Sequence, residues 1–324
     1  MKSFLKVFTV ILAMLLLAGI AHGCAGVHEN GPETTAPASP TGTAEAVYTE
    51  QPTEEPTVEP TPEPKGFELH FIDVGTGDGM LLICDGEAMI IDGGNLPERV
   101  GREETMVKYA RSKGVEKLKY IIVTHGHNDH VGGIPAVIDA FPFETMFKNS
   151  APCDDDLHTE LLKLMEDRGI TPVDPEVGSV YKLGGGSFTV LTPITIDKTN
   201  VNNDSIGIKF TYGENTFLLL GDCTSTVENQ LLKAGVDLKA DVFKANHHAS
   251  TTGNTKKFLE AVSPKYVCVQ VGTENKLGYP SATTIKRLTS AAELGLYRND
   301  QHGTVVFYSD GTNITVVTEK QPAD

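Results

Sequence analysis

Residues 124–130 read Thr124-His125-Gly126-His127-Asn128-Asp129-His130, and this stretch decides both the fold and the chemistry of the chain. It places three imidazoles and one carboxylate in one short loop, and these groups are ligands for Zn²⁺ and similar divalent ions. The apolar residues 120–123 before it predict a buried strand, and open α/β sheets place their ligand sites at the carboxyl ends of strands. A polar turn that only caps the next helix is the alternative, but this spacing of histidines favours a metal site.

Strands and helices alternate in both halves of the sequence. The glycine turn Gly75-x-Gly77-x-Gly79 lacks the spacing of a dinucleotide-binding loop, and a strand rather than a helix follows it. We expect helices over residues 103–113, 157–168 and 227–233, and another that begins at Ile134. Predicted strands cover residues 67–74, 80–84, 88–91, 120–123, 188–191, 206–210, 216–220, 266–271 and 303–307. This order predicts two sheets that pack face to face under a cover of helices.

The N-terminal residues 1–24 have the pattern of an export signal. Lys2 and Lys6 precede an apolar run over residues 7–21, which is shorter than the roughly 20 residues that span a bilayer. A transmembrane anchor is therefore the less favoured alternative. Ala21-His22-Gly23-Cys24 is similar to the lipobox of bacterial lipoproteins, so we expect lipidation of Cys24 and anchoring at the extracellular face of the cell membrane.

Residues 25–65 have the composition of an extended stalk. They carry eight prolines, eight threonines and eight glutamates, and no lysine or arginine before Lys65. Such a segment buries too little apolar area to offset the entropy of ordering the chain, and its proline pairs favour stiff, extended conformations. Residues 66–320 are then expected to form the globular domain.

Composition also narrows the partners and the redox chemistry. The formal net charge of −16 argues against a broad basic surface for nucleic acid, although bound divalent ions would make a local positive site. No Cys-x-x-Cys pair occurs, and Cys84 and Cys268 lie in apolar runs that predict buried thiols. Spacing alone assigns no disulfide.

Asp92, residues 124–130, Gly221-Asp222 and His247 form an ordered set that resembles the metallo-β-lactamase superfamily. The resemblance implies an α/β fold, the four-layer αββα sandwich of that family. Over roughly residues 67–310 the sequence is also similar to the ComEC-like branch, the hydrolases of DNA-uptake competence. The phrases that carry this similarity are Phe71-Ile72-Asp73-Val74-Gly75-x-Gly77-Asp78, Asp92-Gly93-Gly94, Asn202-Asn203-x-Ser205, His247-His248-x-Ser250, Gly272-x-x-Asn275 and Arg298-x-Asp300-x-x-Gly303.

Four positions depart from the branch. Thr76 stands where glutamine is usual, Ala249 where glycine is usual, and Asn299 where threonine is common. Tyr279 replaces a histidine, which changes the substrate pocket or the proton donor of the branch. The full competence protein also carries a membrane channel, so we expect no DNA import by this chain alone.

The resemblance implies two divalent metal ions, Zn²⁺ or Mn²⁺. The implied ligands are His125 and His127 for the first ion, Asp129, His130 and His247 for the second, and Asp222 as the bridge between them. The adjacent His248 is the alternative ligand to His247 and is otherwise expected to line the pocket.

The first metal position is short of one ligand. Many family members supply a further histidine between the main cluster and the bridging aspartate, and His158 is the histidine that this chain has in that interval. Its place on an amphipathic helix favours a surface position over a ligand role. Asn202, Asn203 or Asp204 could complete the site instead, which would admit Mn²⁺ beside Zn²⁺.

The implied chemistry is hydrolysis by a hydroxide that bridges the two metals. Asp129 and Asp222 would act as catalytic residues that orient this hydroxide, while Asp73 and Asp92 are expected to fix loops. The expected substrate contacts are His248, Ser250, Asn275 and Arg298. Turn chemistry is the alternative for Ser250 and Asn275, and a surface ion pair for Arg298.

Three functions remain in view. The ComEC-like phrases favour an exported, membrane-anchored phosphodiesterase or nuclease that acts on a small or polymeric phosphodiester, with DNA as one candidate. A lactonase or β-lactamase that cleaves C–O or C–N bonds is the alternative, although such enzymes usually have the extra first-site histidine. A non-catalytic cell-surface binding module is disfavoured because every principal metal ligand is present.

Overall fold

The computed structural model describes residues 66–96, 105–273 and 277–321. The export signal, Cys24, the stalk and the predicted start of the helix over residues 103–113 lie outside the described residues and stay predictions. Among the described residues, no helix combines the length and the apolar character needed to cross a membrane.

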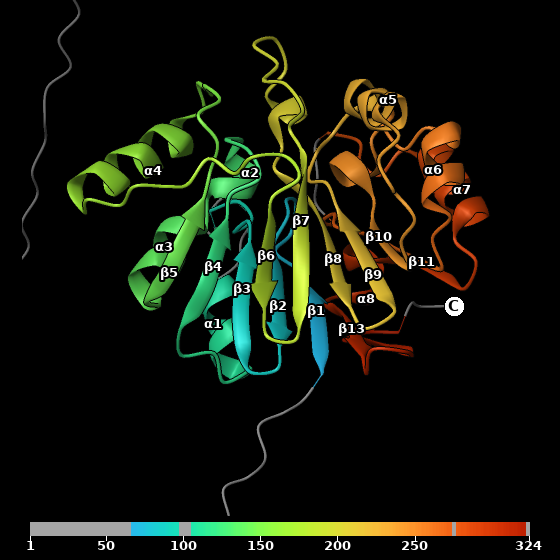
Figure 1. The fold of residues 1–324 in the computed structure, drawn as a ribbon, viewed down its shortest axis with the longest axis horizontal. Helices are drawn as coiled ribbons and strands as arrows, with labels where there is room; N and C mark the ends of the chain where they lie inside the picture. The colour runs from blue at the N-terminus through green and yellow to red at the C-terminus, as the bar shows by residue number, and fades with distance from the viewer. Residues whose placement is uncertain (1–65, 97–104, 274–276, 322–324) are drawn as a thin grey trace, which may run out of the picture. The chain divides into compact units, whose positions relative to one another are not determined.

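Two mixed sheets, each of seven strands in the described residues, form the centre of the domain (Figure 1). The first sheet has the spatial order β14 (Ile314–Thr318), β13 (Val305–Ser309), β1 (Phe67–Phe71), β2 (Met80–Cys84), β3 (Glu87–Ile91), β4 (Leu118–Ile122) and β5 (Phe143–Phe147). The second sheet has the order β12 (Gly295–Arg298), β11 (Tyr266–Val269), β10 (Val242–Lys244), β9 (Asn215–Leu219), β8 (Gly207–Tyr212), β7 (Gly186–Thr192) and β6 (Val180–Leu183).

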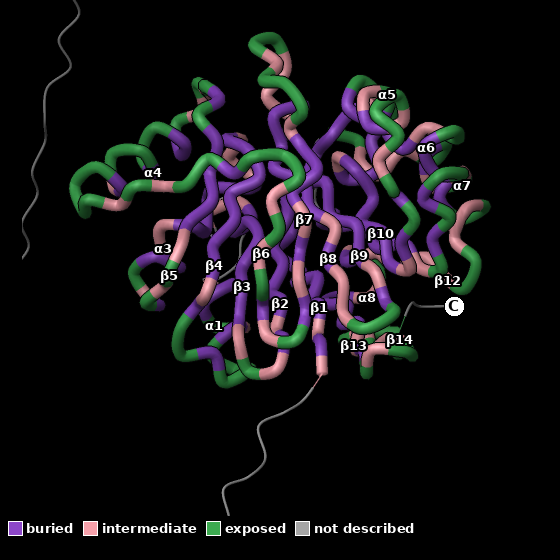
Figure 2. The backbone as a smooth tube through the Cα atoms, viewed as in Figure 1, coloured by how far each residue is buried: buried purple, intermediate pink, exposed green. Residues whose placement is uncertain are grey.

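Apolar side chains of the two sheets pack against each other and make the central core. Phe67 of β1 and Phe210 of β8 stack across the interface, with their ring centroids 4.4 Å apart. Figure 2 shows these strands buried, while exposure concentrates on the helices and the outer loops. The alternation of inward and outward residues in each strand thus gives every strand one face for this core.

Helices cover the outer face of each sheet. The first sheet packs against α1 (Thr105–Ser112), α2 (Asn128–Val131), α3 (Ile134–Ala140) and α4 (Asp156–Asp167). The second packs against α5 (Ser225–Ala234), α6 (Lys256–Val262) and α7 (Ala282–Ala291). The remaining short helices are η2 (Val201–Asp204), η3 (Asn246–Ala249) and α8 (Asn299–His302). The expected αββα sandwich is confirmed.

The direction of the parallel strands determines where the candidate site lies. Strands β3, β4 and β5 run parallel, and so do β9, β10, β11 and β12. Carboxyl ends of parallel strands meet at one edge, so the loops after β3, β4, β9 and β10 gather there. These loops begin with Asp92, Val123, Leu220 and Ala245 respectively.

Several elements differ from the expectation. The predicted strand over residues 67–74 ends at Phe71, and residues 128–131 of the histidine loop form the separate helix α2. Strands β5, β6, β10, β12 and β14 and helices α6 and α7 were not predicted. The edge strands among them alternate weakly between apolar and polar residues. The two helices combine few apolar residues with many polar ones.

Two glycines let the loop after β3 touch the start of α3, and this contact is testable. A Cβ atom on Gly133 would lie 2.3 Å from the Gly93 carbonyl oxygen, although Gly133 has an ordinary φ of −85°. We expect Gly133→Ala to lower the free energy of unfolding in urea by about 3 kcal/mol, since backbone cannot yield to the methyl group. The control is Gly169→Ala, which has open space but a φ of +65° and should cost about 1 kcal/mol. Equal losses in both variants would contradict the clash.

Candidate metal centre

The histidine loop starts where β4 ends, and Asp92 fixes its geometry from the end of β3. One Asp92 oxygen, Oδ1, accepts the Thr124 backbone N–H at 2.8 Å, and the other, Oδ2, accepts the His130 Nδ1–H at 2.7 Å. Both Asp92 and His130 are fully buried. The Nδ1 bond leaves Nε2 of His130 facing inward as a potential metal ligand.

His125 and His127 extend over the same loop. Nε2 of His125 lies 2.9 Å from Nδ1 of His127, and Nδ1 of His125 lies 3.3 Å from the Ser205 hydroxyl. His125 is buried, whereas His127 is partly exposed. The two imidazoles are therefore close enough to share one ion.

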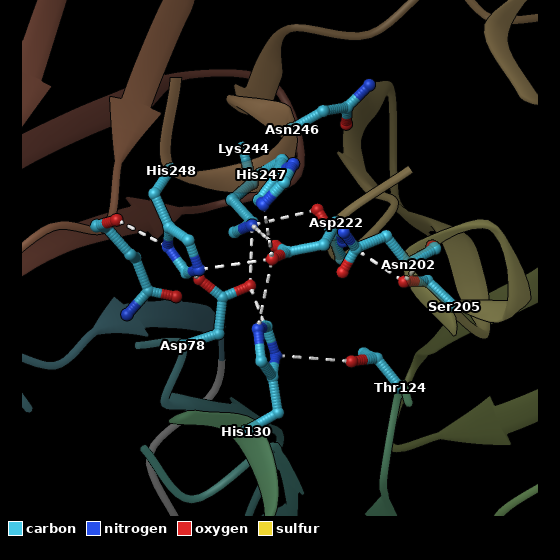
Figure 3. A network of polar contacts seen from close by, with 12 residues as sticks. Asp78, Thr124, His130, Asn202, Ser205, Asp222, Lys244, Asn246, His247 and His248 are labelled. Atoms are coloured by element: carbon cyan, nitrogen blue, oxygen red, sulfur yellow. Dashed lines mark hydrogen bonds and ion pairs between the residues drawn. The ribbon is translucent and has the colours of Figure 1, made fainter. Parts of the chain in front are cut away.

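Asp222 brings the second sheet to this cluster. It follows β9, and its backbone N–H donates to the Ser205 hydroxyl at 3.1 Å. Its Oδ2 atom lies 3.3 Å from Nε2 of His130 and 3.2 Å from Nε2 of His248 (Figure 3). One carboxylate oxygen thus faces imidazoles from both sheets.

His248 points into the cluster, whereas His247 lies nearer its rim, with Nε2 3.8 Å from Oδ2 of Asp222. Residues 247–249 all adopt left-handed backbone conformations, with φ of 48°, 49° and 58°. This turn aims Nε2 of His248 between Asp222 and Asp129, at 3.2 and 3.3 Å, while Nδ1 donates to the Gln270 carbonyl at 2.9 Å. His247 stays at the rim, where Nδ1 meets the Thr252 hydroxyl at 2.8 Å and Nε2 the Tyr279 hydroxyl at 3.3 Å.

The donor set suits a pair of divalent ions. Nitrogen and oxygen atoms converge in the groups His125–His130–Asp222 and Asp129–His130–His248. Nε2 of His130 and Nε2 of His248 are buried and make no hydrogen bond of acceptable geometry among the described residues. Both nitrogens face carboxylate oxygens instead, at 3.2–3.3 Å. Cations coordinated by these nitrogens and oxygens together would satisfy the buried donor set.

Electrostatics oppose protonation of one histidine and favour it at two others. Burial and the neighbouring His130 hold the pKa of His125 well below its usual range. Burial would also lower the pKa of His248, but Asp222 and Asp129 outweigh it and raise that pKa to about 10. Burial opposes protonation of His130 too, yet Asp222 and Asp92 raise its pKa well above the usual value. A metal would displace these protons, because coordination needs neutral imidazole.

An ion pair beneath the cluster joins the two sheets. Nζ of Lys244, at the end of β10, lies 2.5 Å from Oδ2 of Asp78 and donates to the Gly221 carbonyl at 2.9 Å. Both side chains are completely buried. Asp78 also lies 3.4 Å from Nδ1 of His248. Sequence reasoning assigned no role to either residue, although a lysine inside an apolar strand is a visible signal of a buried partner.

The other predicted substrate contacts are dispersed. Ser250 is buried and its hydroxyl contacts that of Thr252 at 2.7 Å, so it supports the His247 turn. Arg298 makes a two-pronged ion pair with Asp300, at 3.0 and 2.5 Å. Asn275 lies outside the described residues and stays a prediction.

The first metal position has two remaining candidate donor oxygens among the three residues considered. Asn203 is bonded to Thr224 and Asp197, and Oδ1 of Asp204 accepts the Asp197 backbone N–H. Oδ1 of Asn202 and Oδ2 of Asp204 are buried and have no hydrogen-bond partner in the described chain. The expected surface position of His158 is wrong, because its side chain packs under the histidine loop with 2% exposure. It joins none of the converging ligand groups found among the described residues.

The sequence from residue 72 to residue 272 matches the family model described as the Metallo-beta-lactamase superfamily. The chain belongs to this superfamily, and its fold and buried histidine–aspartate cluster agree with that membership. Its class is therefore that of the metal-dependent hydrolases with this fold.

Curated relatives point to the competence branch. ComE operon protein 3 of Bacillus subtilis (strain 168) is 24% identical over 255 residues, which cover 74% of this chain and 33% of that protein. Recombination protein 2 of Haemophilus influenzae (strain ATCC 51907 / DSM 11121 / KW20 / Rd) is 25% identical over 233 residues, 68% of this chain and 26% of that protein. The chain thus spans between about a quarter and a third of the length of these relatives. The resemblance to competence proteins is confirmed.

A solved structure supports the fold. CmlA, a diiron beta-hydroxylase from Streptomyces venezuelae, has a TM-score of 0.50 and 14% identity, with coverage of 80% of this chain and 55% of that one. At this identity the likeness concerns the fold alone.

The buried ion pair gives the first prediction for this site. We expect Lys244→Met to lower the free energy of unfolding by about 3–5 kcal/mol, because Asp78 is left buried without its counter-charge. The double variant Lys244→Met with Asp78→Asn should recover part of this loss. The control Lys209→Met removes a pair with the exposed Asp237 and should cost less than about 1 kcal/mol. Denaturation in urea measures all of these variants; equal costs for both lysines would contradict the assignment.

The two adjacent histidines give the second prediction. We expect His248→Ala to bind about one metal equivalent fewer than the parent chain, because its Nε2 lies in the ligand group. His247→Ala should keep the parent stoichiometry, since its imidazole sits at the rim. Metal content after gel filtration measures both, with circular dichroism as the check on folding. Loss of metal in His247→Ala alone would restore His247 as the ligand.

Proposed function

We propose that this chain is a phosphodiesterase, or nuclease, that uses two divalent ions, Zn²⁺ or Mn²⁺. The observation that carries the proposal is the convergence of His125, His130 and Asp222, and of Asp129, His130 and His248, from loops of both sheets. We further propose export and anchoring through lipid on Cys24, from the signal and the lipobox-like sequence.

His125 and His127 would hold the first ion, and Asp129, His130 and His248 the second, with Asp222 between them. His248 takes the place that the motif assigns by preference to His247, since its nitrogen lies 3.2 Å from Asp222. Ions held here supply Lewis-acid charge and lower the pKa of water from 15.7 toward about 7. Asp129 and Asp222 would then accept hydrogen bonds from the attacking water and orient it toward phosphorus.

The rim of the site offers groups for substrate. The Tyr279 hydroxyl and Nε2 of His247 lie 3.3 Å apart beside the metal-facing carboxylates. Burial is the main cause that raises the pKa of Tyr279, and Asp222 adds to it, so the phenol stays protonated and can donate a hydrogen bond. A phosphate oxygen is a suitable acceptor for that bond.

Relatives support a phosphodiester substrate over other bonds. The curated names include ComE operon protein 3 and Recombination protein 2, and the motif phrases resemble the competence hydrolases. The net charge of −16 favours short nucleic acids or other small phosphodiesters over long DNA held by a broad surface. A lactonase or β-lactamase is the second candidate, and a metal-free binding module the third.

Substrate choice can be tested with two chromogenic compounds. We expect the metal-loaded chain to hydrolyse bis-p-nitrophenyl phosphate and to leave nitrocefin intact, because its motif phrases resemble those of competence hydrolases. His127→Ala should lose at least about 100-fold in kcat/KM through loss of a metal ligand. The control Lys163→Ala alters an exposed ion pair on α4 and should keep full activity.

Each other outcome selects another function. Turnover of nitrocefin alone supports the C–N hydrolase. A chain that takes up no stoichiometric metal supports the binding module and overturns the proposal.

A further inference from the structure

A cavity of about 410 Å³ lies beside the histidine loop, between the segment after β5 and helix α4. Its lining includes Lys148, Cys153 and His158. A Cβ atom on Gly126 would lie 2.5 Å from Cβ of Cys153 and 3.0 Å from Cδ2 of His158. Gly126 stands between His125 and His127, so the cavity wall and the first metal position share one loop.

Lys148 brings a buried positive charge to this cavity. Its side chain is 7% exposed, and Nζ donates to the carbonyl of its own neighbour, Asn149, at 2.9 Å. No carboxylate in the described chain comes within 4.0 Å of Nζ. Asp174 also lines the cavity, but its Oδ2 accepts the Ser150 backbone N–H at 3.2 Å. Burial lowers the pKa of Lys148, and the more distant Asp174 offsets this in part.

An uncompensated buried lysine needs a physical explanation. Lysine is rarely buried unless it is paired, because desolvation of the ammonium group is costly. Lys244, the buried lysine at the metal centre, follows that rule with Asp78 at 2.5 Å. Two of the three Nζ protons of Lys148 are left without an acceptor in the described residues, and an anion would take them.

His158 belongs to the same cavity wall. Its Nδ1 donates to the Cys153 carbonyl at 3.0 Å, which leaves Nε2 with a lone pair when the ring is neutral. Nε2 is buried and has no partner among the described residues. Burial lowers the pKa of His158, so the ring stays neutral near pH 7. Nε2 itself is shielded from solvent, so the neutral ring adds no charge to the wall, and Lys148 is the cationic donor there.

We propose that this cavity, the Lys148 cavity, binds a phosphate group that adjoins the scissile phosphodiester, with Lys148 on an anionic oxygen. The inference about substrate rests on the proposed function; the binding of phosphate does not. A chain of nucleotides has this chemistry, since every residue repeats phosphate and sugar. The cavity then sets a preference for substrates with at least two phosphates.

The first arm of the test measures binding without metal. We titrate the full chain, stripped of metal with EDTA, with inorganic phosphate by calorimetry. The parent chain and the control Lys163→Met should bind, and Lys148→Met should bind at least about tenfold more weakly, as expected for loss of a charge-assisted hydrogen bond. Lys148→Met should keep or raise the melting temperature, because a buried cation is replaced by an apolar chain of similar length. If all three proteins bind phosphate equally, or if none of them binds it, the proposed phosphate site in the cavity is overturned.

The second arm separates the cavity from the catalytic proposal. We compare KM for a dithymidine with one phosphate against the same dinucleotide with an added terminal phosphate at either end. Loss of the same hydrogen bond in Lys148→Met should raise KM about tenfold for a two-phosphate substrate and leave KM for the one-phosphate substrate and kcat unchanged. If the chain turns over both substrates and Lys148→Met shifts KM equally for the one-phosphate and the two-phosphate substrate, the cavity is overturned as a substrate subsite. Phosphate binding in the first arm without any turnover overturns the phosphodiesterase and retains the cavity.

Discussion

The buried contact between Lys244 and Asp78 is the constraint on which the site depends. It joins the end of β10 in the second sheet to the turn before β2 in the first, at 2.5 Å and without solvent. Gln270 reinforces the junction, because its amide donates to the carbonyls of Ile72 and Gly79 at 3.2 and 3.0 Å. With the sheets held in this register, the loops that carry the histidines and aspartates end at the same place. A charge inside the apolar strand β10 therefore aligns the two halves of the domain.

The loops around this junction orient the two histidines that face inward. Asp92 holds His130 through Nδ1 at 2.7 Å, and the Gln270 carbonyl holds His248 through Nδ1 at 2.9 Å. In both cases the second nitrogen is turned toward Asp222. Each inward imidazole is thus oriented by an acceptor from its own sheet, which fixes the ring before any ligand arrives. The strained turn over residues 247–249 belongs to the same arrangement, because left-handed conformations of this kind cost about 1–3 kcal/mol each and persist at functional sites.

The sequence predicted the parts of the site that are local. The histidine loop, Asp92 and Asp222 could be recognised from short motifs at strand ends, and the αββα architecture followed from the order of strands and helices. The choice between His247 and His248 could not, because it depends on three consecutive backbone angles that no spacing encodes. The partner of Lys244 lies far away in the sequence, and the burial of His158 depends on how α4 packs under the histidine loop. Edge strands such as β12 and β14 were overlooked because their half-exposed residues alternate weakly.

Division of the ligands between two sheets has a consequence for genome searches. A gene truncated after β5 would still encode the whole run from Thr124 to His130, and a search for that motif would find it. Its product would lack Asp222, Lys244 and His248, all of which come from the second sheet or the loops that follow its strands. A search with this motif alone therefore retrieves fragments and pseudogenes together with complete domains. The residues from the later half of the chain distinguish them.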